Sequence, residues 1–185
     1  MRIKEKLKNR SGFTLAETLL AVLILLLVSV IVANGIPVAR NVYNNVIIGA
    51  NAQVLLSTAV TELRNELGTA QRVEVSPDSE SITYYNATIQ AYSRISKGSD
   101  PASIKVDPYL DPTDLTKTIP GSVQRDLVSN EASNGDLFVT YGSVQKDSDI
   151  VTFTDIEVKR KTGSDATIAS LDELQIRLTS VSPDA

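Results

Sequence analysis

One long apolar stretch near the N-terminus restricts the folds and locations open to this chain. Residues 13–33 carry a single charged side chain, Glu17, among residues that are mostly Leu, Val, Ile and Ala. A helix rises about 1.5 Å per residue, so this stretch would be roughly 30 Å long, which matches the hydrocarbon core of a bilayer. We therefore expect a membrane-spanning helix over residues 13–33.

A basic segment precedes this stretch. Residues 1–12 contain five cations and one anion, Glu5. An excess of Lys and Arg beside a membrane span marks the end that stays in the cytoplasm. The sequence therefore predicts a single-pass membrane protein with a cytoplasmic N-terminus and an extracytoplasmic C-terminal part.

The acidic residue inside the span needs an explanation. A charged group at the middle of a membrane helix costs about 2.5–3.5 kcal/mol, and less near its end. Glu17 lies one helical turn after Phe13. A cut between Gly12 and Phe13 would create an α-amino group at Phe13, and this amine could pair with Glu17 of the same chain or of a neighbouring copy.

The residues around this junction resemble a known N-terminal signature. Residues 11–20 read Ser-Gly-Phe-Thr-Leu-Ala-Glu-Thr-Leu-Leu, after a basic leader and at the start of the apolar span. This combination resembles the N-terminus of type IV pilins and pseudopilins, and it covers less than the first quarter of the chain. The resemblance implies that a prepilin peptidase cleaves between Gly12 and Phe13 and methylates Phe13, and that Glu17 guides assembly of a filament. The implied partners are the inner or cytoplasmic membrane, the prepilin peptidase, an assembly platform and other pilin or pseudopilin subunits.

Two other interpretations of the N-terminus stay open. A secretory signal peptide has a shorter apolar core and an Ala-x-Ala-like cleavage site, of which residues 31–33 are a poor version. An ordinary signal anchor accounts for the basic leader and the span. It gives no reason for Glu17 or for the Gly12-Phe13 junction.

A second helical segment follows the span at residues 34–68. Gly35 and Pro37 are unfavourable inside a helix, by about 1 and 3 kcal/mol, so we expect a helix break there in the form of a kink or a short unwound stretch. From residue 38 the pattern predicts an amphipathic helix that ends at Gly68, a good C-terminal cap. Its predicted apolar stripe, which faces either the protein's own sheet or other subunits, is Val42, Val46, Gly49, Gln53, Leu56, Val60, Leu63 and Leu67.

The remaining residues, 69–185, have the pattern of an exported antiparallel sheet domain. The expected strands cover residues 72–75, 81–85, 88–95, 136–144, 150–161 and 174–179. Alternation in the fifth of these strands predicts that its inward face changes near Asp155. Residues 97–122 hold many prolines and glycines and predict a long irregular loop. The predicted fold class is α+β, with a long helix packed on an antiparallel sheet as in pilins.

Composition argues against several functions. The chain has no Cys and no His, which excludes the usual Ser-His-Asp and Cys-His catalytic arrangements and His- or Cys-ligated zinc. We therefore expect no enzymatic activity. Loss of residues 1–12 would change the formal net charge from −4 to −8. An exported domain this acidic is not expected to bind nucleic acid directly.

One group of acidic residues is a candidate calcium site. Asp107, Asp111 and Asp114 lie close together in the predicted loop. Calcium favours several carboxylate and carbonyl oxygens on an irregular segment, although the spacing is not that of an EF-hand. A solvated acidic loop is the alternative. Tyr84, Tyr85 and Tyr92 are expected to be sheet residues rather than a ligand platform.

The function that these observations favour is structural. The chain resembles a prepilin, and a minor rather than a major subunit, of a type IV pilus or of a type II secretion-like pseudopilus. A competence pseudopilin that serves DNA uptake is an alternative within the same class. A membrane-anchored extracellular binding module that never polymerises is the alternative from another class.

Overall fold

The computed structural model describes residues 14–98, 103–111, 114, 119, 124–129, 136–161 and 166–179. The chain divides into two units, Met1–Val46 and Ile47–Ala185, and each is described by itself. The predicted leader, residues 1–12, and Phe13 lie outside the described residues. The fold class is α+β, because one long helix is followed by antiparallel strands.

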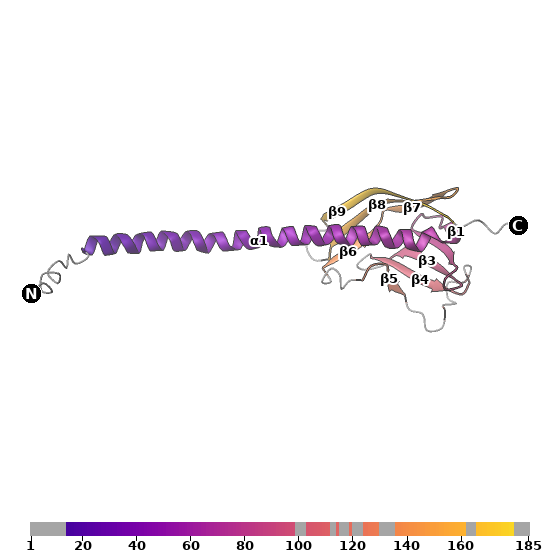
Figure 1. Ribbon diagram of the computed structural model, residues 1–185, viewed down its shortest axis with the longest axis horizontal. Coiled ribbons are helices and arrows are strands. Elements are labelled where there is room, and N and C mark those ends of the chain that lie inside the picture. Colours follow the sequence, from indigo (N-terminus) through magenta and orange to yellow (C-terminus); the bar gives the residue numbers. More distant parts are fainter. Residues whose placement is uncertain are drawn as a thin grey trace, which may run out of the picture. The chain divides into compact units, whose positions relative to one another are not determined.

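The described part of the first unit is entirely helical after Thr14. Helix α1 (Leu15–Gly68) begins here and continues into the second unit (Figure 1). Every described residue up to Val46 is exposed, although most are apolar. At 1.5 Å per residue the helix from Leu15 to Val46 is roughly 48 Å long, more than a bilayer core requires. Within the described ranges, α1 is the one helix long and apolar enough to span a membrane.

Of the two outcomes expected at Gly35 and Pro37, the short unwound stretch is wrong, and the kink stays a prediction. Both residues lie inside α1, which is helical without interruption from Leu15 to Gly68. A proline in a helix loses one backbone hydrogen bond and crowds one carbonyl group. An unwound segment would instead create two new helix ends, each with up to four unsatisfied backbone groups. The continuous helix leaves fewer polar groups without partners.

The second unit contains two antiparallel sheets rather than the single sheet expected. The first has five strands in the order β1-β2-β3-β4-β5, and in the second β6 and β7 pair with one edge of β8 while β9 pairs with the other. In Figure 1, β3 and β4 lie on one side of the C-terminal half of α1, and β8 and β9 lie on the other. The strands are β1 (Gln71–Val75), β2 (Ser81–Asn86), β3 (Ala91–Lys97), β4 (Ile104–Tyr109), β5 (Arg125–Asp126), β6 (Leu137–Thr140), β7 (Ser143–Asp147), β8 (Ile150–Arg160) and β9 (Thr167–Arg177).

The core joins both sheets to the last part of α1. The helical residues that it buries are Ala52, Leu55, Leu56, Ala59, Leu63 and Leu67. The predicted stripe shares Leu56, Leu63 and Leu67 with this set. Gln53 of the stripe is exposed, however, and the preceding residue, Ala52, is buried instead. The buried face is therefore set by how the two sheets meet α1, and it lies to one side of the predicted stripe.

The predicted irregular loop at residues 97–122 is partly wrong, because β4 lies within it. Pro108 obscured this strand in the sequence, since proline cannot donate a ladder hydrogen bond. In the structure β4 pairs with β3 along its whole length, whereas β5 pairs with β4 only at Lys105 and Val106. Pro108 therefore stands where one side of β4 has no partner among the described residues, and proline is tolerated there.

The inward face of β8 changes at Asp155, which confirms the sequence prediction. Val151 and Phe153 are buried before it and Ile156 and Val158 after it, while Asp155 is exposed and has a φ of 51°. Gly142, between β6 and β7, lies beside this point and its N–H donates to the carbonyl oxygen of Thr154 at 2.8 Å. The inward face of β8 therefore changes where Gly142 and Asp155 lie side by side.

Replacing Gly142 by alanine should destabilise the second unit. A Cβ at this position would lie 3.0 Å from Asp155 Oδ2 and 3.3 Å from the backbone oxygen of Thr154. Crowding of this kind costs about 1–3 kcal/mol. Urea denaturation followed by tyrosine fluorescence measures the change. Gly49→Ala is the matched control, because nothing lies within 4 Å of a Cβ added at this position and alanine favours a helix. This variant should be as stable as the wild type or more stable. Equal stability of both variants would contradict the steric role of Gly142.

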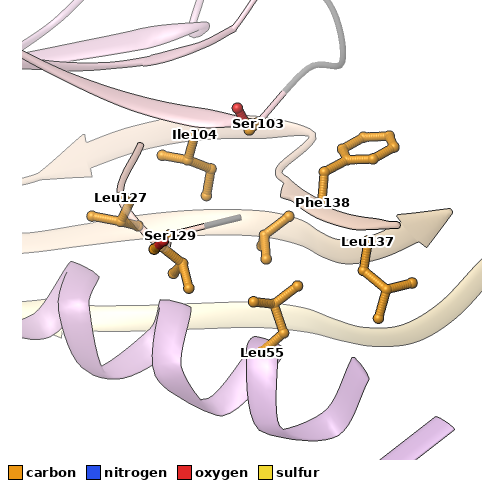
Figure 2. A pocket seen from close by; sticks show the side chains of 9 residues that line it. Leu55, Ser103, Ile104, Leu127, Ser129, Leu137 and Phe138 are labelled. Atoms are coloured by element: carbon orange, nitrogen blue, oxygen red, sulfur yellow. The ribbon is translucent and has the colours of Figure 1, made fainter. Parts of the chain in front are cut away.

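The contact region between Leu55 of α1, the segment after β5 and β6 is almost fully packed. Figure 2 shows Leu55 of α1, Leu127 and Leu137 around a cavity of about 10 Å³. This volume holds about one water molecule. The cavity is a packing gap of the core and too small for a ligand.

Candidate functional site

The described part of the N-terminal signature begins at Thr14. Gly12 and Phe13, the predicted cleavage and methylation residues, lie outside the described residues. The carboxylate of Glu17 accepts hydrogen bonds from the backbone N–H of Thr14 at 2.8 Å and from its hydroxyl at 3.0 Å. In return the hydroxyl oxygen of Thr14 accepts from the N–H of Glu17 at 3.3 Å. Thr14 and Glu17 therefore cap the first turn of α1 reciprocally.

This capping arrangement gives Glu17 a role that the sequence interpretation missed. The signal was present, because Thr followed three residues later by Glu before an apolar run is the pattern of a capping box. At the start of a membrane helix the unpaired N–H groups are costly, since lipid offers no replacement partner. Glu17 thus satisfies its own helix within one chain, and its predicted role in assembly stays a prediction.

The three predicted calcium ligands do not form a cluster in the described structure. The carboxylate of Asp107, in β4, accepts a hydrogen bond from Gln124 Nε2 at 2.9 Å. The N–H of Asp114 donates to the backbone oxygen of Asp111 at 3.3 Å. Among the described residues there is no group of three or more His, Cys, Asp or Glu that could hold a metal ion. Several residues of the segment are not described, so the calcium site stays a prediction.

A polar cluster that local sequence patterns did not reveal lies near the end of α1. The Glu66 side chain is 13% exposed and forms an ion pair with Arg125, which is 52% exposed. Tyr84, fully buried on β2, donates its hydroxyl hydrogen to Glu66 Oε2 at 2.8 Å, and Asn86 Nδ2 lies at 3.5 Å from the same oxygen. The two partners lie 59 positions apart in the chain, so no local pattern could indicate this ion pair.

This cluster forms one wall of a cavity of about 380 Å³, which we call the Arg125 pocket. The volume lies within the range of small-molecule sites. The pocket lies between the end of α1, the β2–β3 turn and the inner face of β3 and β4. Its lining includes Asn65, Glu66, Thr69, Thr88, Ile89 and Arg125.

The environment of Tyr84 predicts a loss of stability at alkaline pH. Burial, followed by the nearby Glu66 carboxylate, raises the pKa of Tyr84 well above its ordinary value of 10.0. The folded protein keeps this tyrosine neutral, so its contribution is fully present below about pH 10 and is lost as the pH rises, by up to about 1.4 kcal/mol per pH unit. Urea denaturation at several pH values above 9 measures the slope.

A tyrosine-to-phenylalanine series identifies the group responsible for this slope. Tyr84→Phe should reduce the slope, and part of it should persist because burial also raises the pKa of Tyr141. Tyr43→Phe, at a position that is 66% exposed, should keep the wild-type slope. A Tyr84→Phe variant with an unchanged slope would show that Tyr84 ionises equally in the folded and unfolded chain.

Comparisons of the chain with protein-family models, with curated proteins and with solved structures found no match.

Proposed function

We propose that this chain is a prepilin-like subunit of a type IV pilus or of a type II secretion-like pseudopilus. The observation that carries the proposal is the coincidence of a Gly12-Phe13 junction, a basic leader and a lone Glu17 at the start of one long apolar helix. The exposed apolar surface of α1 from Leu15 to Val46 supports it, because such a surface requires lipid or other helices as its surroundings.

In this proposal the chain has two locations. Before processing it is a single-pass protein of the inner or cytoplasmic membrane, with residues 1–12 in the cytoplasm. After cleavage, α1 leaves the bilayer and packs with the helices of other subunits in the filament. Its partners are the prepilin peptidase, an assembly platform and those subunits. The second unit, Ile47–Ala185, remains outside the cytoplasm throughout.

The N-terminus of the mature protein tests this proposal. Co-expression with a prepilin peptidase should yield a protein that begins at Phe13, and intact mass spectrometry should find one additional methyl group. An N-terminus at Met1 would favour a plain membrane anchor. A cut after residue 33 would favour a secretory signal peptide. Either outcome would overturn the proposal.

A membrane-anchored binding module that never polymerises is the second candidate. The Arg125 pocket favours it, because the pocket gives the second unit a cavity of ligand size. A retained leader together with ligand binding would identify this function. A competence pseudopilin stays within the first proposal, where the acidic charge of the processed chain disfavours direct contact with DNA.

A further inference from the structure

The Arg125 pocket combines a ligand-sized volume with polar groups of a particular kind. We propose that it binds a neutral, hydroxyl-rich ligand, namely a saccharide unit. The whole lining belongs to the second unit, so the proposal does not depend on cleavage at Gly12 or on filament assembly. The charge of the lining, its polar groups with spare hydrogen-bonding capacity and its apolar wall all favour such a ligand.

The charge of the lining favours a neutral ligand. The pocket contains one carboxylate, Glu66, and one guanidinium, Arg125, and the two neutralise each other as an ion pair. An anion bound to Arg125 would lie close to Glu66, and a cation bound to Glu66 would lie close to Arg125. Glu66 already accepts hydrogen bonds from Arg125, Tyr84 and Asn86, so little of its acceptor capacity remains.

The other polar side chains of the pocket have hydrogen-bonding capacity left. The amide of Asn65 and the hydroxyl groups of Thr69 and Thr88 make no side-chain hydrogen bond within the described parts of the chain. Each of these groups can both donate and accept. Arg125 is half exposed and has further N–H donors besides the one directed at Glu66. Sugar hydroxyl groups also donate and accept, and therefore match this set.

The pocket also has an apolar wall. Val106 and Pro108 of β4 line it, and Ile89 of the β2–β3 turn contributes an exposed aliphatic side chain, 49% accessible. Ile89 is not part of the core cluster. A sugar ring presents C–H groups on its faces and hydroxyl groups at its edge. A pocket with aliphatic side chains on one side and neutral polar groups on the other is complementary to such a ring, and its volume accommodates roughly one or two rings.

Binding is tested on the full chain in detergent micelles by NMR titration. The probes are glucose, galactose, N-acetylglucosamine and their common disaccharides, with acetate, ethylamine and an N-acetyl, C-amide trialanine peptide as comparison ligands. At least one sugar should cause saturable shifts of the backbone signals of Asn65, Thr69, Thr88 and Arg125. It should bind more tightly than each of the comparison ligands.

Two variants and a matched control locate the site. Asn65→Leu and Thr88→Val should each weaken sugar binding by about fivefold, the effect of one neutral hydrogen bond. Thr83→Val makes the same substitution on β2, outside the pocket lining, and should bind as the wild type does. Absence of saturable shifts with every sugar would overturn the proposal. So would tighter binding of acetate, ethylamine or the peptide, or equal affinities of Thr88→Val and Thr83→Val.

Discussion

Replacing Gly12 by valine is expected to leave the full-length precursor in the membrane. Glycine has no Cβ, so the backbone on its side of the scissile bond can approach the catalytic groups of a peptidase closely, and a branched side chain prevents this approach. The expected effect is all or none within the sensitivity of intact mass spectrometry. The wild-type protein should begin at Phe13, whereas Gly12→Val should begin at Met1.

Gly35→Val is the matched control for this experiment. It introduces the same side chain into α1 at a position where nothing lies within 4 Å of an added Cβ. This variant should be inserted and cleaved as efficiently as the wild type. Efficient cleavage of Gly12→Val would show that the junction is not recognised through its glycine. Failure of both variants would point to a defect of membrane insertion instead.

Removing the charge of Glu17 is expected to reduce incorporation into filaments by roughly tenfold or more. A carboxylate beside the freed amine of a Phe13 gains an opposite charge at short range in a low dielectric. Loss of about 1.4 kcal/mol of this attraction corresponds to a tenfold loss in docking. The second unit, Ile47–Ala185, does not contain Glu17, so its stability should be unchanged. Quantification of the variant in sheared filaments, relative to its amount in the membrane, measures incorporation.

The capping arrangement at Thr14 determines which substitution is informative. Glu17→Gln removes the charge but keeps a side-chain oxygen that can accept from the N–H of Thr14, whereas Glu17→Ala removes both. If the charge drives assembly, both variants should be cleaved after Gly12 and both should incorporate poorly. If Glu17→Gln incorporates at the wild-type level and Glu17→Ala does not, the carboxylate serves as a helix cap. Normal incorporation of both variants would leave the cleavage junction as the remaining support for the filament proposal.

Local features of the sequence located the two ends of the long helix and determined part of the strand pattern. The apolar run after Thr14 and the C-terminal cap at Gly68 depend on neighbouring residues, and α1 lies where they indicate. The change of inward face at Asp155 was also visible, because alternation along one strand requires no knowledge of its partners. The capping box of Thr14 and Glu17 could have been found in the same way.

Contacts between distant segments decided the rest. Whether Gln53 or Ala52 faces the core depends on how two sheets meet α1, and the helical pattern allowed either. Strand β4 tolerates Pro108 because its neighbour β5 pairs only with Lys105 and Val106, so the pairing ends before the proline. Glu66 and Arg125 approach each other, and with them the Arg125 pocket forms, because β5 returns to the end of α1. Helix propensity and alternation act over a few residues, whereas a pocket requires segments far apart in sequence to meet, and this meeting is set by the packing of the whole unit.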